Sequence, residues 1–341
     1  MSFKRLDPDD FVVSAQSITA TCWTGNVTAL TTFFTQSNQV SSISGKYYTT
    51  VFNTSSAGDN REAQFQIAYG NENGGGALAY NNTAAPGVSP ASTIYGQYRT
   101  LILEDENANF VWGNYSGSQT FYALSVERAR YKESLLPGSI NLTLSGSGTN
   151  NNLELTDNSK MVNLPTYYGT QRVYQMISGS NGLSYNTGSD GYTTSNGSYG
   201  WFCPDISTVL LNASALDLTT AQGINLNTTT TSNTNGLNNQ KMFNVIVSGK
   251  QFALNSEETI TSDFVFVRAR NSEFNYSENP SYISGSTGEV IYNYFINNPQ
   301  TYMTTIGLYN DSNDLLAVAK LSKPLNKDFT KEALVRVKLD F

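Results

Sequence analysis

The sequence predicts a mainly β protein, made of antiparallel β-sandwich or barrel-like domains with long polar loops and one or two short helices. Two observations support this fold class. Short segments that alternate apolar and polar residues recur along the chain, and Gly, Asn, Ser and Thr fill the stretches between them. Only 14% of the 341 residues are charged, whereas 12% are aromatic. The chain can therefore bury an apolar core while its polar surface stays largely uncharged.

Residues 1–145 are predicted to form an N-terminal β domain of short strands and turns. Its triple glycine, at 74–76, has neither the G-K-[ST] ending nor the following helix of a phosphate-binding loop. We therefore expect a mobile turn there and no nucleotide site. The predicted strands of this domain are 11–20, 65–69, 98–103, 121–126 and 140–144.

Residues 146–262 are predicted to form a loop-rich insertion or surface region. Long stretches of this region consist of Gly, Asn, Ser and Thr without apolar periodicity. We expect the loops at 181–200 and 223–240 to lie on the surface and to be poor in regular structure.

One segment of the middle region is predicted to be a helix, namely Pro204–Leu216. Asp205 could cap its N-terminus, and Val209, Leu210 and Ala213 follow helical spacing.

Residues 263–341 are predicted to form a C-terminal β region that packs with the first domain. A strand is expected at 264–270. The clearest pattern in this region is a hairpin, because the apolar segments 302–309 and 315–320 flank an Asn/Asp-rich turn at 310–314.

The last predicted strand, 334–341, alternates apolar and polar residues without a break. Val335, Val337, Leu339 and Phe341 fall on one face, which is the pattern of a half-buried strand. Because unpaired termini usually fray, we expect this strand to be paired, either within the fold or with a neighbouring chain. Phe341 is expected to be buried.

Residue types that carry catalysis are scarce in this chain. It contains no histidine, which is the commonest general base and transition-metal ligand. Cys22 and Cys203 lie far apart and each adjoins an aromatic residue. We expect two buried free thiols, with a mutual disulfide as the alternative. The acidic clusters at 7–10 and 104–106 lack calcium-loop spacing. No enzymatic activity, cofactor or metal is therefore expected.

Charge and hydropathy restrict the partners. The formal net charge of −7 disfavours direct binding of nucleic acid, which depends on neutralising phosphates. The sequence contains no run of about 18 apolar residues, so we expect no membrane span. Its first ten residues are polar, with no apolar segment of a secretory signal behind them. We expect synthesis in a cytoplasm without export by the protein itself.

Basic residues gather at strand ends and near the C-terminus, where Lys320, Lys323, Lys327 and Lys331 follow one another closely. Two interpretations remain open. Lysines can guard a solvated edge strand against aggregation, or basic residues can meet a neighbouring subunit whose complementary charge sets the register. The candidate interface residues are Arg128, Arg130, Lys132, Arg268, Arg270, Arg336, Lys338 and Phe341.

Three segments carry a family resemblance: 128–139, 274–282 and 305–324. They resemble a structural protein of large contractile-tailed phages, the T-even-like myoviruses and their relatives in marine cyanobacteria. The resemblance covers about a quarter of the chain, mostly its C-terminal third, and it brings no catalytic residue with it.

The resemblance implies a multi-copy virion structural subunit of the tail or baseplate, which assembles through strand edges and loops. Its partners would be other virion proteins and copies of itself, and its location the virion, after synthesis in the host cytoplasm. The alternative is a capsid-surface, decoration or fibre-like protein that contacts the host or the environment through the middle loops. An enzyme such as a glycan hydrolase is disfavoured, because no informative carboxylate pair accompanies the three tryptophans.

Overall fold

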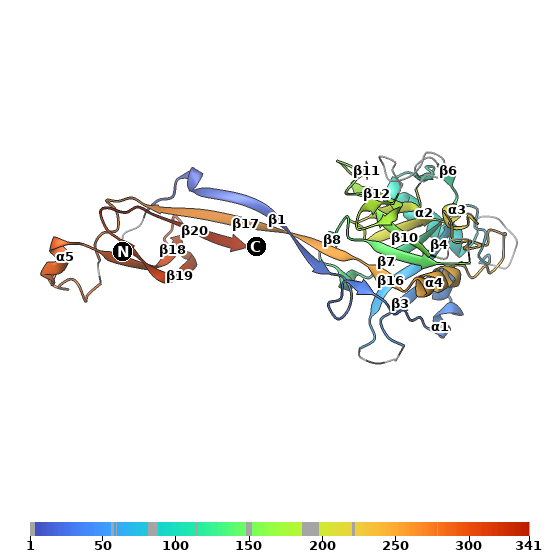
Figure 1. The fold of residues 1–341 in the computed structure, drawn as a ribbon, viewed down its shortest axis with the longest axis horizontal. Coiled ribbons are helices and arrows are strands. Elements are labelled where there is room, and N and C mark those ends of the chain that lie inside the picture. The colour runs from blue at the N-terminus through green and yellow to red at the C-terminus, as the bar shows by residue number, and fades with distance from the viewer. Residues whose placement is uncertain are drawn as a thin grey trace. The chain divides into compact units, whose positions relative to one another are not determined.

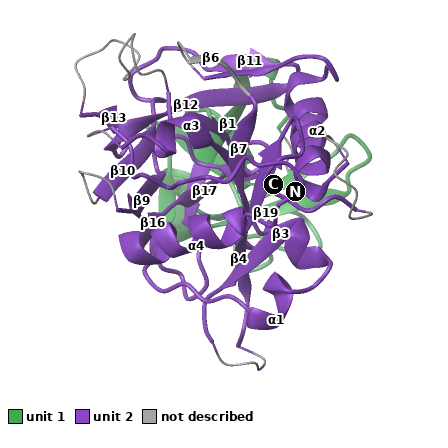
Figure 2. Cartoon of the chain, turned by 90° about the vertical axis from the view of Figure 1, so that its right-hand side faces the viewer, with its two compact units in different colours: residues 1–17, 259–341 green, residues 18–258 purple. Residues whose placement is uncertain are grey.

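The computed structural model describes residues 4–55, 58, 60–80, 88–112, 115–147, 152–185, 198–219, 222–277 and 279–340. The protein is mainly β, and its paired strands are antiparallel (Figure 1). This confirms the predicted fold class. The chain divides into two compact units (Figure 2). Unit 1 comprises residues 1–17 and 259–341, and unit 2 comprises residues 18–258.

Unit 2 contains an antiparallel sheet of twelve described strands, in the order β2-β16-β9-β10-β12-β14-β15-β7-β4-β3, with β11 and β13 paired to β12. The strands along the path are β2 (Ala29–Leu30), β16 (Gln251–Ala253), β9 (Asn141–Ser145), β10 (Asn152–Asp157), β12 (Gln171–Ser180), β14 (Gly200–Cys203), β15 (Thr208–Asn212), β7 (Thr120–Val126), β4 (Ala63–Asn71) and β3 (Tyr48–Phe52). The two branches are β11 (Thr166–Tyr168) and β13 (Leu183–Ser184).

Short elements complete unit 2. They are the helices α1 (Ser37–Val40), α2 (Pro90–Leu103), α3 (Ala213–Leu216) and α4 (Asn238–Gly249), the 3-10 turns η2 (Ser44–Lys46) and η3 (Arg128–Arg130), and the strands β5 (Phe110–Trp112), β6 (Tyr115–Ser118) and β8 (Ser134–Leu135).

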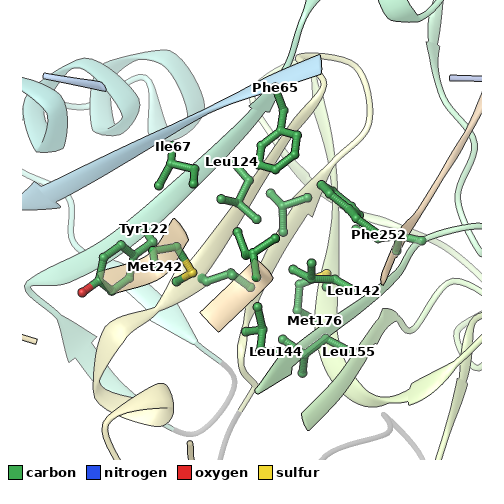
Figure 3. Close-up of a cluster of buried hydrophobic side chains, with 14 of the residues drawn as sticks. Phe65, Ile67, Tyr122, Leu124, Leu142, Leu144, Leu155, Met176, Met242 and Phe252 are labelled. Atoms are coloured by element: carbon green, nitrogen blue, oxygen red, sulfur yellow. The ribbon is translucent and has the colours of Figure 1, made fainter. Parts of the chain in front are cut away.

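The sheet of unit 2 has an apolar cluster on each face. Along β4 and β7, Phe65, Ile67 and Leu124 point to one side, where Met242 of α4 joins them (Figure 3). Ala123 of β7 points to the other side. That second cluster also contains Tyr95 of α2, Trp112 and Trp201. The central strands are therefore buried on both faces.

The predicted helix at 204–216 is wrong. Val209, Leu210 and Leu211 belong to β15, and only Ala213–Leu216 are helical. All three apolar side chains are fully buried, because Val209 and Leu211 enter one cluster and Leu210 the other. A short apolar run that is buried on both faces hides the strand period of two. Asp205 caps no helix and instead binds Arg172, with 2.6 Å between the Arg172 Nη2 and Asp205 Oδ1 atoms.

The predicted strand at 98–103 is also wrong, because these residues form the second half of α2. The helix begins with the cap Ser89, whose Oγ accepts a hydrogen bond from the Ser92 N–H at 3.4 Å, and with Pro90 in its first turn. These helix-start signals precede residues 98–103, so the segment from which the strand was predicted does not contain them.

The loop predicted at 223–240 is confirmed only in part. Residues 223–237 have no helix or strand, but residues 238–240 belong to the first turn of α4, and the loop is only partly a surface feature. Ile224 is fully buried. The Gly76 N–H donates to the Thr231 carbonyl at 2.8 Å, so this loop is fixed to the triple-glycine turn. A Cβ atom on Gly75 would lie 2.0 Å from the Thr230 carbonyl oxygen, which explains the glycine there. Residues 186–197 of the other predicted loop lie outside the described residues.

Unit boundaries differ from the three expected zones. Strands β10, β12, β14 and β15 come from the expected insertion, yet they lie between β9 and β7 in one sheet. Residues 18–145 therefore share a core with the residues up to 258, while residues 1–17 join the C-terminal region. Long-range strand pairing, which composition does not reveal, sets these boundaries.

Unit 1 is built on the strands β1 (Phe11–Thr21), β17 (Asn255–Ala269) and β20 (Ala333–Asp340), in the order β1-β17-β20. β1 and β17 both continue into unit 2, where β8 pairs with the start of β17. A separate hairpin is formed by β18 (Thr301–Tyr309) and β19 (Leu315–Lys327). The unit also contains η1 (Pro8–Asp10) and α5 (Asn293–Asn297).

The strand predictions for this region are confirmed, and residues 264–269 of the first one belong to β17. The hairpin has the predicted turn, and the terminal strand pairs within its own chain, from Ala269↔Ala333 to Ser262↔Asp340. Phe341 lies outside the described residues.

Candidate assembly interface

One face of the β17–β20 ladder in unit 1 is apolar. Residues directly opposite in an antiparallel pair lie on the same face, so the pair Val265↔Val337 shares a face with Ala269↔Ala333. These four side chains are buried. Val267, Val335 and Leu339 on the same face are only partly buried.

An open cleft of about 1770 Å³ adjoins this apolar face. Its lining comes only from unit 1, namely from the sheet face, the N-terminal segment, the segment 274–279 and the hairpin. Pockets for small molecules typically measure roughly 300–1,000 Å³, so this cleft is large for a small ligand. Apolar lining residues from the sheet and the hairpin include Val265, Val335, Leu339, Ile306, Leu308 and Ala317.

The hairpin exposes apolar side chains to an unusual extent. Leu316 and Val318 of β19 are 68% and 56% exposed, and Tyr302 of β18 is 61% exposed. Among the described strands, β18 and β19 pair only with each other, so each leaves a free edge. An isolated two-stranded hairpin is marginally stable in water, and free apolar edges invite pairing with another chain.

β1 also exposes apolar side chains. Its residues from Phe11 to Ala20 are all exposed, among them the apolar run Phe11-Val12-Val13. It forms one edge of the described β1-β17-β20 order. Unit 1 thus exposes several apolar strands around one cleft, and contiguous surfaces of this kind usually mark interaction sites.

The turn of the hairpin and the middle of β19 carry opposite charges. The turn carries the exposed carboxylates Asp311 and Asp314. It is a defined turn, since the Asp314 N–H donates to Asn310 Oδ1 at 2.8 Å. Further along β19, Lys320 and Lys323 are exposed where the register shifts opposite Thr304.

Lys327 does not belong to this exposed basic set, although the sequence groups it there. Its side chain is fully buried. The ammonium donates to the Asn271 carbonyl at 2.9 Å, to Asn275 Oδ1 at 2.7 Å and to the Asp328 carbonyl at 3.0 Å. These hydrogen bonds replace its lost hydration and tie the base of β19 to the turn at 271–275.

Three predicted interface residues of unit 1 share one face. Because Arg268 lies opposite Leu334 and Arg336 opposite Phe266, Arg268, Arg336 and Lys338 all lie on the other face of β17–β20, together with Phe264 and Phe266. Each is exposed, and Lys338 Nζ lies 2.9 Å from Asp340 Oδ1. Arg270 is exposed just beyond β17.

The N-terminal segment is tied to the end of β17. Lys4 Nζ donates to the Arg268 carbonyl at 2.6 Å and lies 2.9 Å from Glu273 Oε2, which also accepts a hydrogen bond from the Arg270 N–H. The Arg270 hydrogen bond and then the Lys4 contact lower the pKa of Glu273.

Arg128, Arg130 and Lys132, the other predicted residues, belong to unit 2. Arg130 has partners inside the unit, because its Nη1 atom lies 2.7 Å from Glu62 Oε2 and its side chain is only 15% exposed. The hydrogen bond from Thr24 and the Arg130 charge lower the pKa of Glu62. Arg128 lies over the Tyr131 ring, and Lys132 is exposed.

Among the described residues, no group of three or more Cys, Asp or Glu side chains is arranged to hold a metal ion. None of the described helices is both long enough and apolar enough to cross a membrane. Cys22 and Cys203 are free and buried, which confirms the predicted thiols. Burial raises the pKa of Cys22 to about 12 and also raises the pKa of Cys203.

No family model, curated protein or solved structure matches this chain. Its function is therefore inferred from the surface of unit 1 and from the resemblance in its sequence.

Proposed function

We propose that the chain is a multi-copy structural subunit of a phage virion, located in the tail or baseplate, that assembles through the strand edges and loops of unit 1. The observation that carries the proposal is the open apolar cleft of unit 1 with its exposed strands. A large apolar surface left in water is unfavourable, and contact with a neighbouring subunit would remove it from water.

The phage setting rests on the resemblance of 128–139, 274–282 and 305–324 to a myovirus structural protein. The last of these segments includes much of the hairpin, so the resemblance and the proposed interface meet in the same element. The proposed role is structural rather than enzymatic, and the subunit would reach the virion after synthesis in the host cytoplasm.

A capsid-surface or fibre-like protein is the second candidate. It is favoured by large exposed side chains in the middle region of unit 2. Leu164, Tyr167 and Tyr185 are 79%, 60% and 63% exposed. Such residues could contact a host surface.

Quantitative mass spectrometry of purified phage particles, separated into tails and heads, tests both candidates. The leading proposal expects several copies of the chain in each tail and none in tail-free heads. Enrichment in heads would favour the second candidate. Absence of the chain from complete particles would contradict both.

A further inference from the structure

We propose that a second copy of this chain covers the cleft of unit 1, with the two β18–β19 hairpins antiparallel to each other. This inference rests on the proposed function, because it names the partner of the same surface. The pairing sets the acidic turn of each hairpin, with Asp311 and Asp314, against the basic segment of the other, with Lys320 and Lys323.

The first argument is that the apolar surface of the hairpin is incompletely buried in a single copy. The hairpin contributes Ile306, Leu308 and Ala317 to the cleft, and these residues are only partly buried. Val318, which lies opposite Gly307, is more than half exposed. The hairpin of an isolated copy therefore lacks a covered core, and an added strand supplies both backbone partners and apolar contacts.

The second argument is charge complementarity within one element. Thr305 lies opposite Lys320, and Tyr309 precedes the acidic turn by one residue. Lys320 follows Asp314 by six residues along the chain. At about 3.3 Å per residue, the two charged groups are separated by roughly 20 Å along the hairpin. A two-fold, antiparallel arrangement brings each acidic turn to the other copy's lysines, whereas a parallel one sets like charges together.

The third argument concerns the overall charge. Unit 1 contains ten basic and twelve acidic residues, so it is almost neutral and its copies repel each other only weakly. Because unit 1 carries both signs needed for the contact, a partner with a different surface is not required.

The experiment uses charge reversal in the full chain. The acidic-turn variant carries Asp311→Lys and Asp314→Lys, and the basic-segment variant carries Lys320→Asp and Lys323→Asp. We expect the wild type to self-associate in sedimentation equilibrium. Each variant alone should associate at least about 10-fold more weakly, because every reversal acts twice in a two-fold interface. An equal mixture of the two variants should restore association.

The control variant carries Glu289→Lys and Glu332→Lys. It makes the same charge change as the acidic-turn variant, but at exposed positions of unit 1 that do not line the cleft. It should associate like the wild type. Restoration in the mixture also shows that both variants fold.

A second measurement uses cross-linking between the exposed positions Ser312 and Ser322. Ser312→Cys and Ser322→Cys variants should form disulfide-linked dimers much faster when mixed than either does alone, and the buried Cys22 and Cys203 should not take part. A wild type that stays monomeric at its highest soluble concentration, or a mixture that does not regain association, overturns the inference. A monomeric chain that is nonetheless abundant in tails would leave the proposed function intact.

Discussion

Lys327 is the residue whose environment departs furthest from expectation. A lysine is rarely fully buried without a charged partner, yet the Lys327 ammonium donates to two backbone carbonyls and the Asn275 amide oxygen. Its energetic role is to satisfy three acceptors at once.

Replacing this lysine gives a direct test. Lys327→Met keeps most of the apolar stem but removes a donor from three acceptors. The Asn271 carbonyl still accepts from Asn275 Nδ2 and the Asp328 carbonyl from the Lys331 N–H, so the main loss is at the buried Asn275 Oδ1, which costs about 1–3 kcal/mol. We expect the stability of unit 1 to fall by about 1–3 kcal/mol, measured by urea unfolding. Lys331→Met is the control and should cost less than about 1 kcal/mol, because it removes only the contact of an exposed lysine with Asp328. Equal stability of both variants would contradict the anchoring role.

The two cysteines give a second residue-scale prediction. Because burial raises the pKa of the Cys22 thiol to about 12, almost no reactive thiolate exists near pH 8. We expect neither Cys22 nor Cys203 to react with a thiol reagent in the folded protein, and both to react after denaturation. Rapid labelling of either residue in the native state would contradict the described burial.

Asp328 makes the stability of unit 1 depend on pH. Hydrogen bonds from Thr330, and then from Lys331, lower the pKa of Asp328 from 3.8 to about 2. A carboxyl whose folded pKa is lowered stabilises the protein above its unfolded pKa. That stabilisation is lost as the pH falls from about 3.8 to about 2. We expect Asp328→Asn to lower the melting temperature slightly at pH 7 and to lower it much less near pH 2. Asp9→Asn should leave the melting temperature unchanged at both pH values.

At the scale of elements, the β17–β20 ladder has one buried face and one exposed face, so adjacent substitutions should differ sharply. Val337 lies opposite Val265 and is buried, while Lys338 is exposed. We expect Val337→Ser to cost about 1.5–3 kcal/mol. Lys338→Ser should cost less than about 1 kcal/mol. Both are measured by chemical denaturation with a probe in unit 1. A similar cost for both variants would mean that β20 is not held by its apolar face.

The hairpin and the terminal strand could be predicted because their signals are local: a period of two and an Asn/Asp-rich turn. The centre of the large sheet could not, since Val209, Leu210 and Leu211 are buried on both faces and lose that period. The cleft could not be predicted from the sequence either, for a different reason. It depends on where the chain between Arg270 and Thr301 places the hairpin, and no spacing in the sequence encodes that placement.

At the scale of the whole molecule, the two units differ greatly in their apolar cores. Both large buried clusters lie within unit 2. The buried apolar residues of unit 1 among those described are Val265, Ala269, Phe295, Ala333 and Val337.

This difference predicts two unfolding transitions in calorimetry, with unit 1 unfolding first. Because association stabilises the folded state by mass action, the lower transition should also rise with protein concentration, while the upper one stays constant. Val337→Ser should shift only the lower transition. A single unfolding transition whose midpoint rises with protein concentration would contradict independent unfolding of the two units.

The order of the chain has a consequence for biosynthesis. Unit 1 is discontinuous, so β1 emerges from the ribosome before unit 2, and its partner β17 is completed only afterwards. At roughly 5–20 residues per second, the intervening residues take on the order of ten seconds or more to translate. Unit 2 can fold in that interval, whereas the hairpin and β20 are still unmade. The hairpin side of the proposed interface is therefore completed only after unit 2, so nascent chains on neighbouring ribosomes cannot associate through their hairpins while unit 2 is being made.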